Sequence, residues 1–245
     1  MKHIVHLFSV VFIFISLGVN ATVVPLQDRV LFSSTDSDRR LLIVNNDGQA
    51  PVLLQSWIDD GATGDINKEK NYPFVVIPAV ARMAPGKVLN LKILPTEKIS
   101  ELPRDRESVF WINLYEIPGV KRTKQSHNIN KIEVGLNSQL KIIYRPFKEA
   151  MNINTTGESI GLRLTDGGKS LEITNPTPYY ITPVSVKVKS PDAGQSVTLG
   201  MNRLIAPFSH KRFKLSKAVN NKKTTVEYIL VDDVGKNASF MKVLN

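Results

Sequence analysis

Hydrophobic and polar residues alternate in short runs along the first half of the chain. A period of two places apolar side chains on one face of a strand and polar side chains on the other. Turn-forming residues such as Asp60-Gly61 and Ala84-Pro85-Gly86 separate the runs. The pattern predicts strands at Leu41–Val44, Val52–Ile58, Val88–Ile93 and Val109–Leu114. Short strands without intervening helices are typical of a β-sandwich.

A second group of alternating runs follows Arg145-Pro146, where proline should end a strand because it cannot donate to a ladder. This group comprises Leu162–Leu164, Ser170–Thr174, Val184–Val188, Val226–Leu230 and Phe240–Val243. We therefore predict an all-β protein with two immunoglobulin-like sandwiches, at residues 22–147 and 148–245. Both segments are close to the roughly 100 residues of one such domain.

The first 21 residues have the features of an export signal. Lys2 precedes an apolar stretch from Leu7 to Val19, which is shorter than the roughly 20 residues that a membrane span requires. Val19 and Ala21 give the small-residue pattern of a cleavage site. We expect residues 1–21 to be removed after Ala21, with an uncleaved anchor or a buried helix as the alternatives.

Composition narrows the chemistry that the chain can perform. It contains no cysteine, which excludes a disulfide scaffold, a thiolate metal site and a cysteine nucleophile. Of four histidines, His3 and His6 lie in the leader, and only His127 and His210 remain. We predict no enzymatic activity, no metal and no cofactor, although a Ser-His-Asp site at either histidine stays open. In an exported protein, the formal charge of +10 favours acidic partners or anionic membrane surfaces over nucleic acid, with an ordinary soluble basic surface as the alternative.

One long segment resembles the signature of a known family. Leu102–Pro118 contains an acidic residue followed by serine (Glu107-Ser108), then a strand with aromatic residues, Asn113-Leu114 and Ile117-Pro118. This order is similar to that of the periplasmic chaperones that assemble pili by the chaperone–usher route (PapD-like), although Gly119 departs from the residue usual there. Weaker similarities are Gln55–Ile58, Ala84–Gly86, Lys141–Pro146, Asn175–Tyr179 and Ala206–Ser209.

The resemblance implies a fold, a location and a set of partners. It implies two immunoglobulin-like domains arranged as a boomerang around an interdomain cleft, a periplasmic location and no catalysis. The implied partners are pilus or fimbrial subunits and an outer-membrane usher. Two states of the free protein stay open: a monomer, or a self-associated form that covers the subunit-binding residues.

The segment from Ile132 to Leu140 has apolar residues at alternate positions on one face. Taken alone, such a strand most often buries that face in its own core. The resemblance instead implies a donor strand, in which Ile132, Val134 and Leu136 fill the groove of an incomplete subunit.

Two further groups of residues are implied by the resemblance. Arg29 and Lys141 correspond to the pair that holds the subunit's C-terminal carboxylate, which suits a planar guanidinium fork and a compact ammonium charge. Glu107, Arg145 and Asp233 correspond to a charged cluster that links the domains and fixes their angle. The alternative for all five is an ordinary solvated surface charge.

Other β-rich functions compete with the chaperone hypothesis. A secreted two-domain adhesin or carbohydrate-binding protein would present exposed aromatic residues, but Trp57 and Trp111 lie in apolar runs and are expected in the core. A pilin-like subunit would have one incomplete domain.

Overall fold

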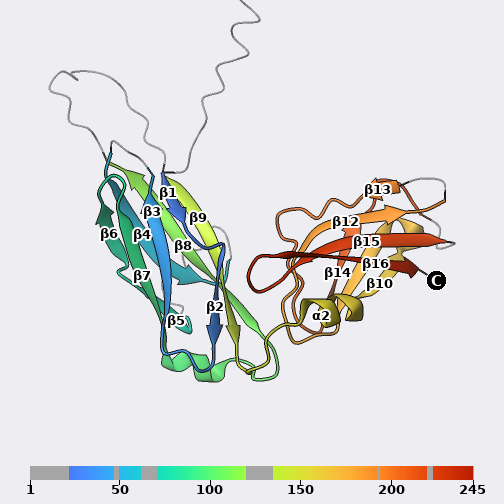
Figure 1. Cartoon of the computed structure of the whole chain (residues 1–245), viewed down its shortest axis with the longest axis horizontal. Coiled ribbons are helices and arrows are strands. Elements are labelled where there is room, and N and C mark those ends of the chain that lie inside the picture. The colour runs from blue at the N-terminus through green and yellow to red at the C-terminus, as the bar shows by residue number, and fades with distance from the viewer. Residues whose placement is uncertain are drawn as a thin grey trace, which may run out of the picture.

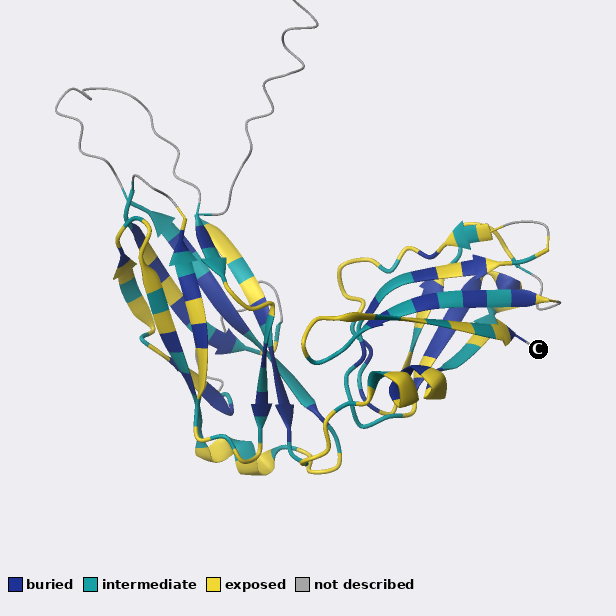
Figure 2. Cartoon of the chain, viewed as in Figure 1, coloured by how far each residue is buried: buried dark blue, intermediate teal, exposed yellow. Residues whose placement is uncertain are grey.

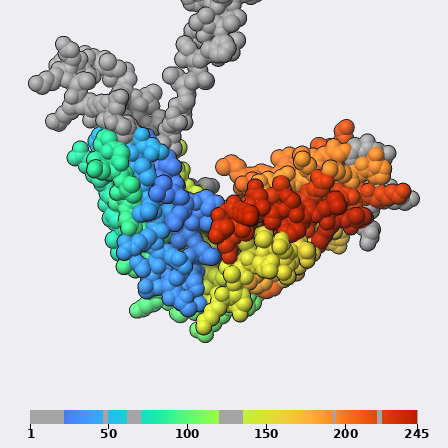
Figure 3. Space-filling model, in the orientation of Figure 1, coloured from blue at the N-terminus to red at the C-terminus, as the bar shows by residue number. Residues whose placement is uncertain are grey.

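The computed structural model describes residues 22–46, 50–61, 71–119, 135–191, 194–219 and 223–244. Two β-sandwich domains meet at an angle and give the molecule a bent outline (Figures 1 and 3). The prediction of an all-β chain with two immunoglobulin-like domains in a boomerang arrangement is confirmed. Residues 1–21, and with them the predicted leader, lie outside the described residues. Within the described part, no helix is long and apolar enough to cross a membrane.

The first domain consists of two packed sheets. One has the strand order β1-β3-β7-β5 and the other has the order β2-β9-β8-β4-β6. The strands are β1 Val23–Pro25, β2 Arg29–Ser33, β3 Arg39–Asn45, β4 Val52–Asp59, β5 Phe74–Ile77, β6 Val80–Met83, β7 Val88–Pro95, β8 Ser108–Pro118 and β9 Leu136–Arg145.

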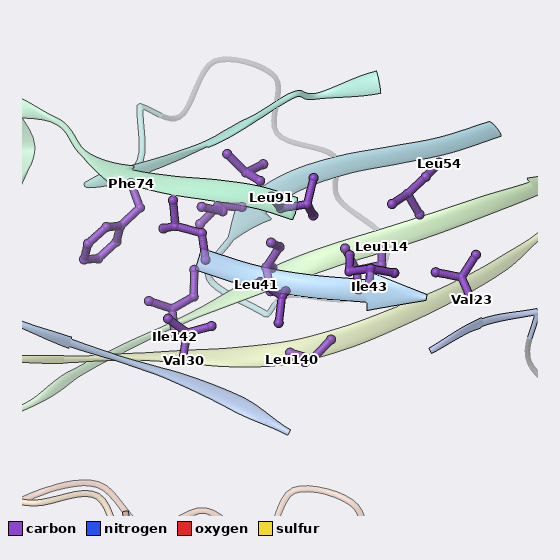
Figure 4. Packing of buried hydrophobic residues seen from close by; sticks show 14 of the residues in the cluster. Val23, Val30, Leu41, Ile43, Leu54, Phe74, Leu91, Leu114, Leu140 and Ile142 are labelled. Carbon is purple, nitrogen blue, oxygen red and sulfur yellow. The ribbon is translucent and has the colours of Figure 1, made fainter. Parts of the chain in front are cut away.

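Alternation along these strands produces the first core. In β4, Val52, Leu54, Ser56 and Ile58 are buried, while the residues between them are exposed or half-buried. Leu41 of β3 and Ile142 of β9 come from opposite sheets and belong to the same buried cluster (Figure 4). Burial of each such side chain is worth about 1.5–3 kcal/mol, so this core holds the two sheets together.

The second domain has a three-stranded sheet, β10-β11-β14, and a four-stranded sheet, β13-β12-β15-β16. The strands are β10 Gly161–Thr165, β11 Ser170–Asn175, β12 Pro183–Lys189, β13 Gly194–Ser196, β14 Ser209–Lys214, β15 Thr224–Val231 and β16 Asn237–Leu244. Its buried cluster is separate from that of the first domain (Figure 2).

A short helix, α2 Ile153–Ser159, closes one end of the second sandwich. The side chain of Asn152 caps it by accepting hydrogen bonds from the N–H groups of Asn154 and Thr155. A Cβ at Gly157 would lie 2.2 Å from the ring of Phe240, and the Tyr228 hydroxyl donates to the Gly157 carbonyl at 2.8 Å. A glycine is therefore required where the helix meets β15 and β16.

Two expectations about individual residues are corrected by the structure. Trp57 and Trp111 are only partly buried and do not belong to the core. The residues next to them in the sequence, Ser56 and Ile58 in β4 and Ile112 in β8, are buried. Because neighbouring side chains of a strand point to opposite faces, the two tryptophans lie on the outer face of their sheet. Tryptophan is amphipathic, and the indole N–H of Trp57 donates to Asp59 at 3.3 Å.

Candidate functional site

Part of strand β9 has a neighbour on one side only. It pairs with β8 from Leu136 opposite Glu116 to Tyr144 opposite Ser108. On its other side, β2 pairs in parallel only with Lys141–Arg145. Among the described strands, residues 136–140 therefore present one free row of main-chain groups. Such a row is a template on which another chain can add a strand.

The apolar face of this segment passes from exposed to buried. Leu136 is 42% exposed, whereas Leu140, on the same face, is 5% exposed and belongs to the first core. Ile132 and Val134 lie outside the described residues. The structure thus places one of the three predicted groove-filling residues, and it places that residue at the surface beside the unpaired edge.

The other face of β9 is fixed to the sheet by polar contacts. The side-chain oxygen Oδ1 of Asn113 accepts hydrogen bonds from the side chains of Asn137 at 3.0 Å and Gln139 at 2.8 Å, and Asn113 Nδ2 donates to the Asp59 carboxylate at 2.7 Å. A Cβ at Gly135 would lie 2.3 Å from the Tyr115 hydroxyl oxygen. The hydrogen bonds of Asn113 link the unpaired part of β9 to β8 and, through Asp59, to β4.

The predicted basic pair lies where the free edge ends. Arg29 of β2 and Lys141 of β9 are directly opposite each other, and Trp111 of β8 is opposite Lys141 on its other side. Directly paired residues share one face of a sheet. The side chain of Lys141 makes no hydrogen bond or ion pair with any described residue. Burial, and then the charges of Arg29 and Arg203, lower its pKa below the usual lysine value.

Arg29 is held from both domains. Its guanidinium donates to the Asp28 carboxylate at 2.9 and 3.3 Å and to the carbonyl oxygen of Asp232, in the second domain, at 3.2 Å. Its side chain is 17% exposed. It lines an open interdomain pocket of about 630 Å³ together with Asp233 and Val234. The pocket is lined by residues of both domains, so an anion can reach Arg29 from the predicted interdomain cleft.

The three predicted cluster residues are in direct contact. Arg145, at the end of β9, forms ion pairs with Glu107 at 2.7 Å and with Asp233 at 2.8 Å. Glu107 accepts a hydrogen bond at 2.6 Å from the Tyr180 N–H, and Arg145 lies 4.9 Å from the centre of the Tyr179 ring. Since Asp233 and both tyrosines belong to the second domain, the cluster crosses the domain interface. Burial raises the pKa of Glu107 above its usual value despite the neighbouring Arg145.

His210 offers no support for a catalytic triad. Its imidazole is 60% exposed and lies 3.9 Å from the Glu172 carboxylate. That carboxylate is already engaged by Arg163 at 2.6 Å and Arg212 at 2.8 Å. His127 lies outside the described residues.

Fold and site together define a class of protein: a two-domain immunoglobulin-like chaperone with an unpaired β-edge beside a cationic cleft. The chain belongs to the PapD family of pilus-assembly chaperones. The family model described as "Pili and flagellar-assembly chaperone, PapD N-terminal domain" matches residues 22–149, and "Pili assembly chaperone PapD, C-terminal domain" matches residues 156–240.

Individual relatives agree with this assignment. The chain is 35% identical to the chaperone protein FimB/FhaD of Bordetella pertussis, over 88% of this chain and 85% of the relative. It is similar in structure to the YadV chaperone, with a TM-score of 0.76 and 26% identity over 91% of this chain and 100% of that chain. The SafB chaperone of Salmonella enterica, solved in complex with the SafA pilin, shares the fold at 22% identity, with a TM-score of 0.72 over 92% of this chain and 97% of that chain. The alternative of an adhesin or carbohydrate-binding protein is not favoured by these matches.

Sequence reasoning missed two residues that adjoin the basic pair. Trp111 lies opposite Lys141, and Asp28 contacts Arg29. The strand alternation placed Trp111 in a strand but could not give its register with Lys141. Asp28 is adjacent to Arg29 in the sequence, but an adjacent pair of opposite charges is too common to stand out.

Proposed function

We propose that this chaperone binds pilus subunits by lending them the unpaired edge of β9. The observation that carries the proposal is that one strand holds both parts of the site: a free main-chain row at residues 136–140 and, directly after it, Lys141 beside Arg29. A subunit that lacks a strand exposes main-chain groups and an apolar groove, and a lent strand satisfies both. Leu136, with Ile132 and Val134 before it, would fill that groove.

The basic pair would set the register of the lent strand. Burial of three aliphatic side chains is worth at most about 1.5–3 kcal/mol each, and a hydrogen bond to a charged group about 1.5–3 kcal/mol. The apolar contacts should therefore supply most of the affinity. A shift of one residue would turn every apolar side chain to the wrong face, and the subunit's C-terminal carboxylate on Arg29 and Lys141 would prevent it.

We infer the wider setting from the same family membership. The protein acts in the periplasm, residues 1–21 are an export signal cleaved after Ala21, and the domains divide near Phe147. The first matched part begins at residue 22, which supports cleavage after Ala21, and it ends at residue 149, two residues beyond Phe147. The protein passes its subunits to an outer-membrane usher, performs no catalysis, and self-associates when free to cover Leu136.

Co-expression with a pilus subunit that aggregates on its own tests the proposal. The wild-type chaperone should yield a soluble one-to-one complex, whereas Arg29→Ala and Lys141→Ala should fold normally and recover at least tenfold less subunit. Lys98→Ala is a matched control, because Lys98 lies in a short 3-10 helix, Glu97–Glu101, and among the described residues forms its ion pair with Glu101. Equal recovery of the subunit by all four proteins would refute the carboxylate anchor.

A further inference from the structure

The cation that would receive a ligand carboxylate already holds a carboxylate of this chain. Asp28, directly before β2, accepts hydrogen bonds from Arg29 Nε at 3.3 Å and from Arg29 Nη2 at 2.9 Å. Two parallel contacts of this kind form the bidentate arrangement that guanidinium groups make with carboxylates. Asp28 therefore occupies one of the forks through which Arg29 could bind a ligand.

The remaining hydrogen-bonding capacity of Arg29 is small. A guanidinium has five N–H donors. Two of them point to Asp28, and one on Nη1 points to the carbonyl oxygen of Asp232 at 3.2 Å. An incoming carboxylate must either displace Asp28 or bind beside it through the two donors that are left. Asp28 opposes binding in both cases, by occupancy in the first and by charge repulsion in the second.

Charge and exposure allow Asp28 to be displaced. Its side chain is 67% exposed, so its contact with Arg29 is screened by solvent and can exchange readily. An aspartate is ionised at neutral pH, and the hydrogen bond from Arg29 lowers the pKa of Asp28 further. Lys141 lies near enough for its charge to interact with Asp28 as well. The negative charge of Asp28 thus acts on both members of the basic pair.

We infer that Asp28 is a resident competitor of the subunit's C-terminal carboxylate, and that it weakens the basic pair so that a bound subunit can be released. This inference rests on the proposed function of Arg29 and Lys141. A chaperone that must release its subunit needs a carboxylate site that sets the register but binds reversibly. The Asp28 carboxylate makes the site reversible, because it pairs with Arg29 again when the subunit's carboxylate dissociates.

The chain contains a matched control for this contact. Arg106 donates to its preceding residue, Asp105, through Nε at 3.0 Å and Nη2 at 2.7 Å. The chemistry and the sequence spacing equal those of Asp28 and Arg29, but this pair does not adjoin Lys141. Asp105→Asn therefore removes the same charge and the same contact without touching the basic pair.

The experiment measures carboxylate binding by the purified mature protein with propionate as the probe. Amide resonances of β2 and β9 are followed by NMR at low salt, with propionamide as the uncharged control. Two unit charges several ångströms apart in water repel by about the thermal energy, which corresponds to roughly a threefold change in affinity. Asp28→Asn should therefore bind propionate at least about threefold more tightly than the wild type. Asp105→Asn should match the wild type, and propionamide should shift no resonance at the pair.

Two sets of results distinguish this inference from the proposed function. If Asp28→Asn binds propionate no more tightly than the wild type, or if Asp105→Asn gains as much, Asp28 is not a competitor. If Arg29→Ala and Lys141→Ala keep wild-type affinity for propionate, or no protein binds it, the anchor itself is wrong. The gain of Asp28→Asn should disappear in the double variant Asp28→Asn/Arg29→Ala, which locates the competition at Arg29.

Discussion

The surroundings of Lys141 disfavour its positive charge. It is half-buried beside Arg29, it makes no ion pair with a described residue, and its pKa is lowered chiefly by burial. A lysine with a lowered pKa in the folded state is costly while it is protonated. A ligand carboxylate would remove that cost because it provides the missing partner. The free protein thus carries a half-buried cation, with no ion-pair partner among the described residues, at the point where the subunit is expected to bind.

Replacing Lys141 should separate stability from binding. Lys141→Met keeps the aliphatic stem and removes the charge, so we expect an unfolding temperature at pH 7 that is equal to the wild type or higher by roughly 1–3 °C. The folded-state pKa lies below the usual 10.5, so the penalty is complete below the folded pKa and is lost as the pH rises towards 10.5. The difference between the proteins should therefore narrow between neutral and alkaline pH in thermal scans. A clearly lower unfolding temperature for Lys141→Met would contradict this account.

Glu172 shows the opposite relation between charge and stability. Hydrogen bonds from Arg212 and Arg163 lower its pKa from 4.5 to about 2. A carboxyl group with a lowered folded pKa contributes stability above its unfolded pKa, and this contribution is lost as the pH falls through the folded pKa. The sequence could not predict this cluster, because its residues come from three strands and depend on register.

The pH dependence of Glu172 can be measured directly. In acid titrations of stability, the advantage of the wild type over Glu172→Gln should be complete above about pH 4.5 and should shrink between 4.5 and about 2. An NMR titration of the Glu172 carboxyl carbon gives the pKa independently. A midpoint near the ordinary value of 4.5 would mean that the arginines do not hold the charge in solution.

At the scale of elements, β9 has two different halves. Its C-terminal half lies between β2 and β8, while residues 136–140 pair only with β8 among the described strands. The change from exposed Leu136 to buried Leu140 occurs at the same place. One strand therefore belongs to the core at one end and presents a free edge at the other.

Substitutions in the two halves of β9 should have opposite effects. Leu136→Asn should change the free energy of unfolding by less than about 1 kcal/mol, because surface substitutions are mostly mild, yet it should reduce subunit recovery severalfold. Leu140→Ala should cost about 2–5 kcal/mol of stability, as buried leucines generally do. Chemical denaturation and subunit recovery measure the two quantities. If Leu136→Asn retained subunits fully, the exposed end of β9 would not be part of the binding surface.

Hydrophobic alternation predicted the long strands but not the short elements. β4 and β15 each contain eight residues with a regular period of two, and the sequence indicated both. β1 and β13 have three residues each, too few to show a period. Helix α2 has seven residues and depends on Gly157 fitting against Phe240, a tertiary contact that no local pattern reveals.

At the scale of the whole molecule, the cluster around Arg145 connects the two domains. Arg145 bridges Glu107 of the first domain and Asp233 of the second, and the adjacent Asp232 contacts Arg29. The interdomain contact and the basic pair thus share one turn between β15 and β16. The resemblance to a family implied the cluster, because three charges far apart in a sequence do not by themselves indicate contact.

Loss of Arg145 should be far more costly than loss of the Asp233 charge. Glu107 is 1% exposed, so Arg145→Met leaves a buried carboxylate without its cation and should cost about 3–5 kcal/mol. Asp233 is 23% exposed, and Asp233→Asn keeps an acceptor, so it should cost about 1 kcal/mol. Adding Glu107→Gln to Arg145→Met should recover part of the loss. Denaturation curves measure stability, and small-angle X-ray scattering should show a changed domain angle for Arg145→Met. Equal stability of the two single variants would refute the bridging role.

Amide hydrogen exchange of the chaperone, free and in complex with a pilus subunit, tests the central claim most directly. If the β9 edge is lent to the subunit, main-chain amides in residues 136–140 should exchange much more slowly in the complex. The edge strands β6 and β16 should change little and serve as internal references. Protection confined to β6, β16 or another surface, with exchange at residues 136–140 unchanged, would contradict the account.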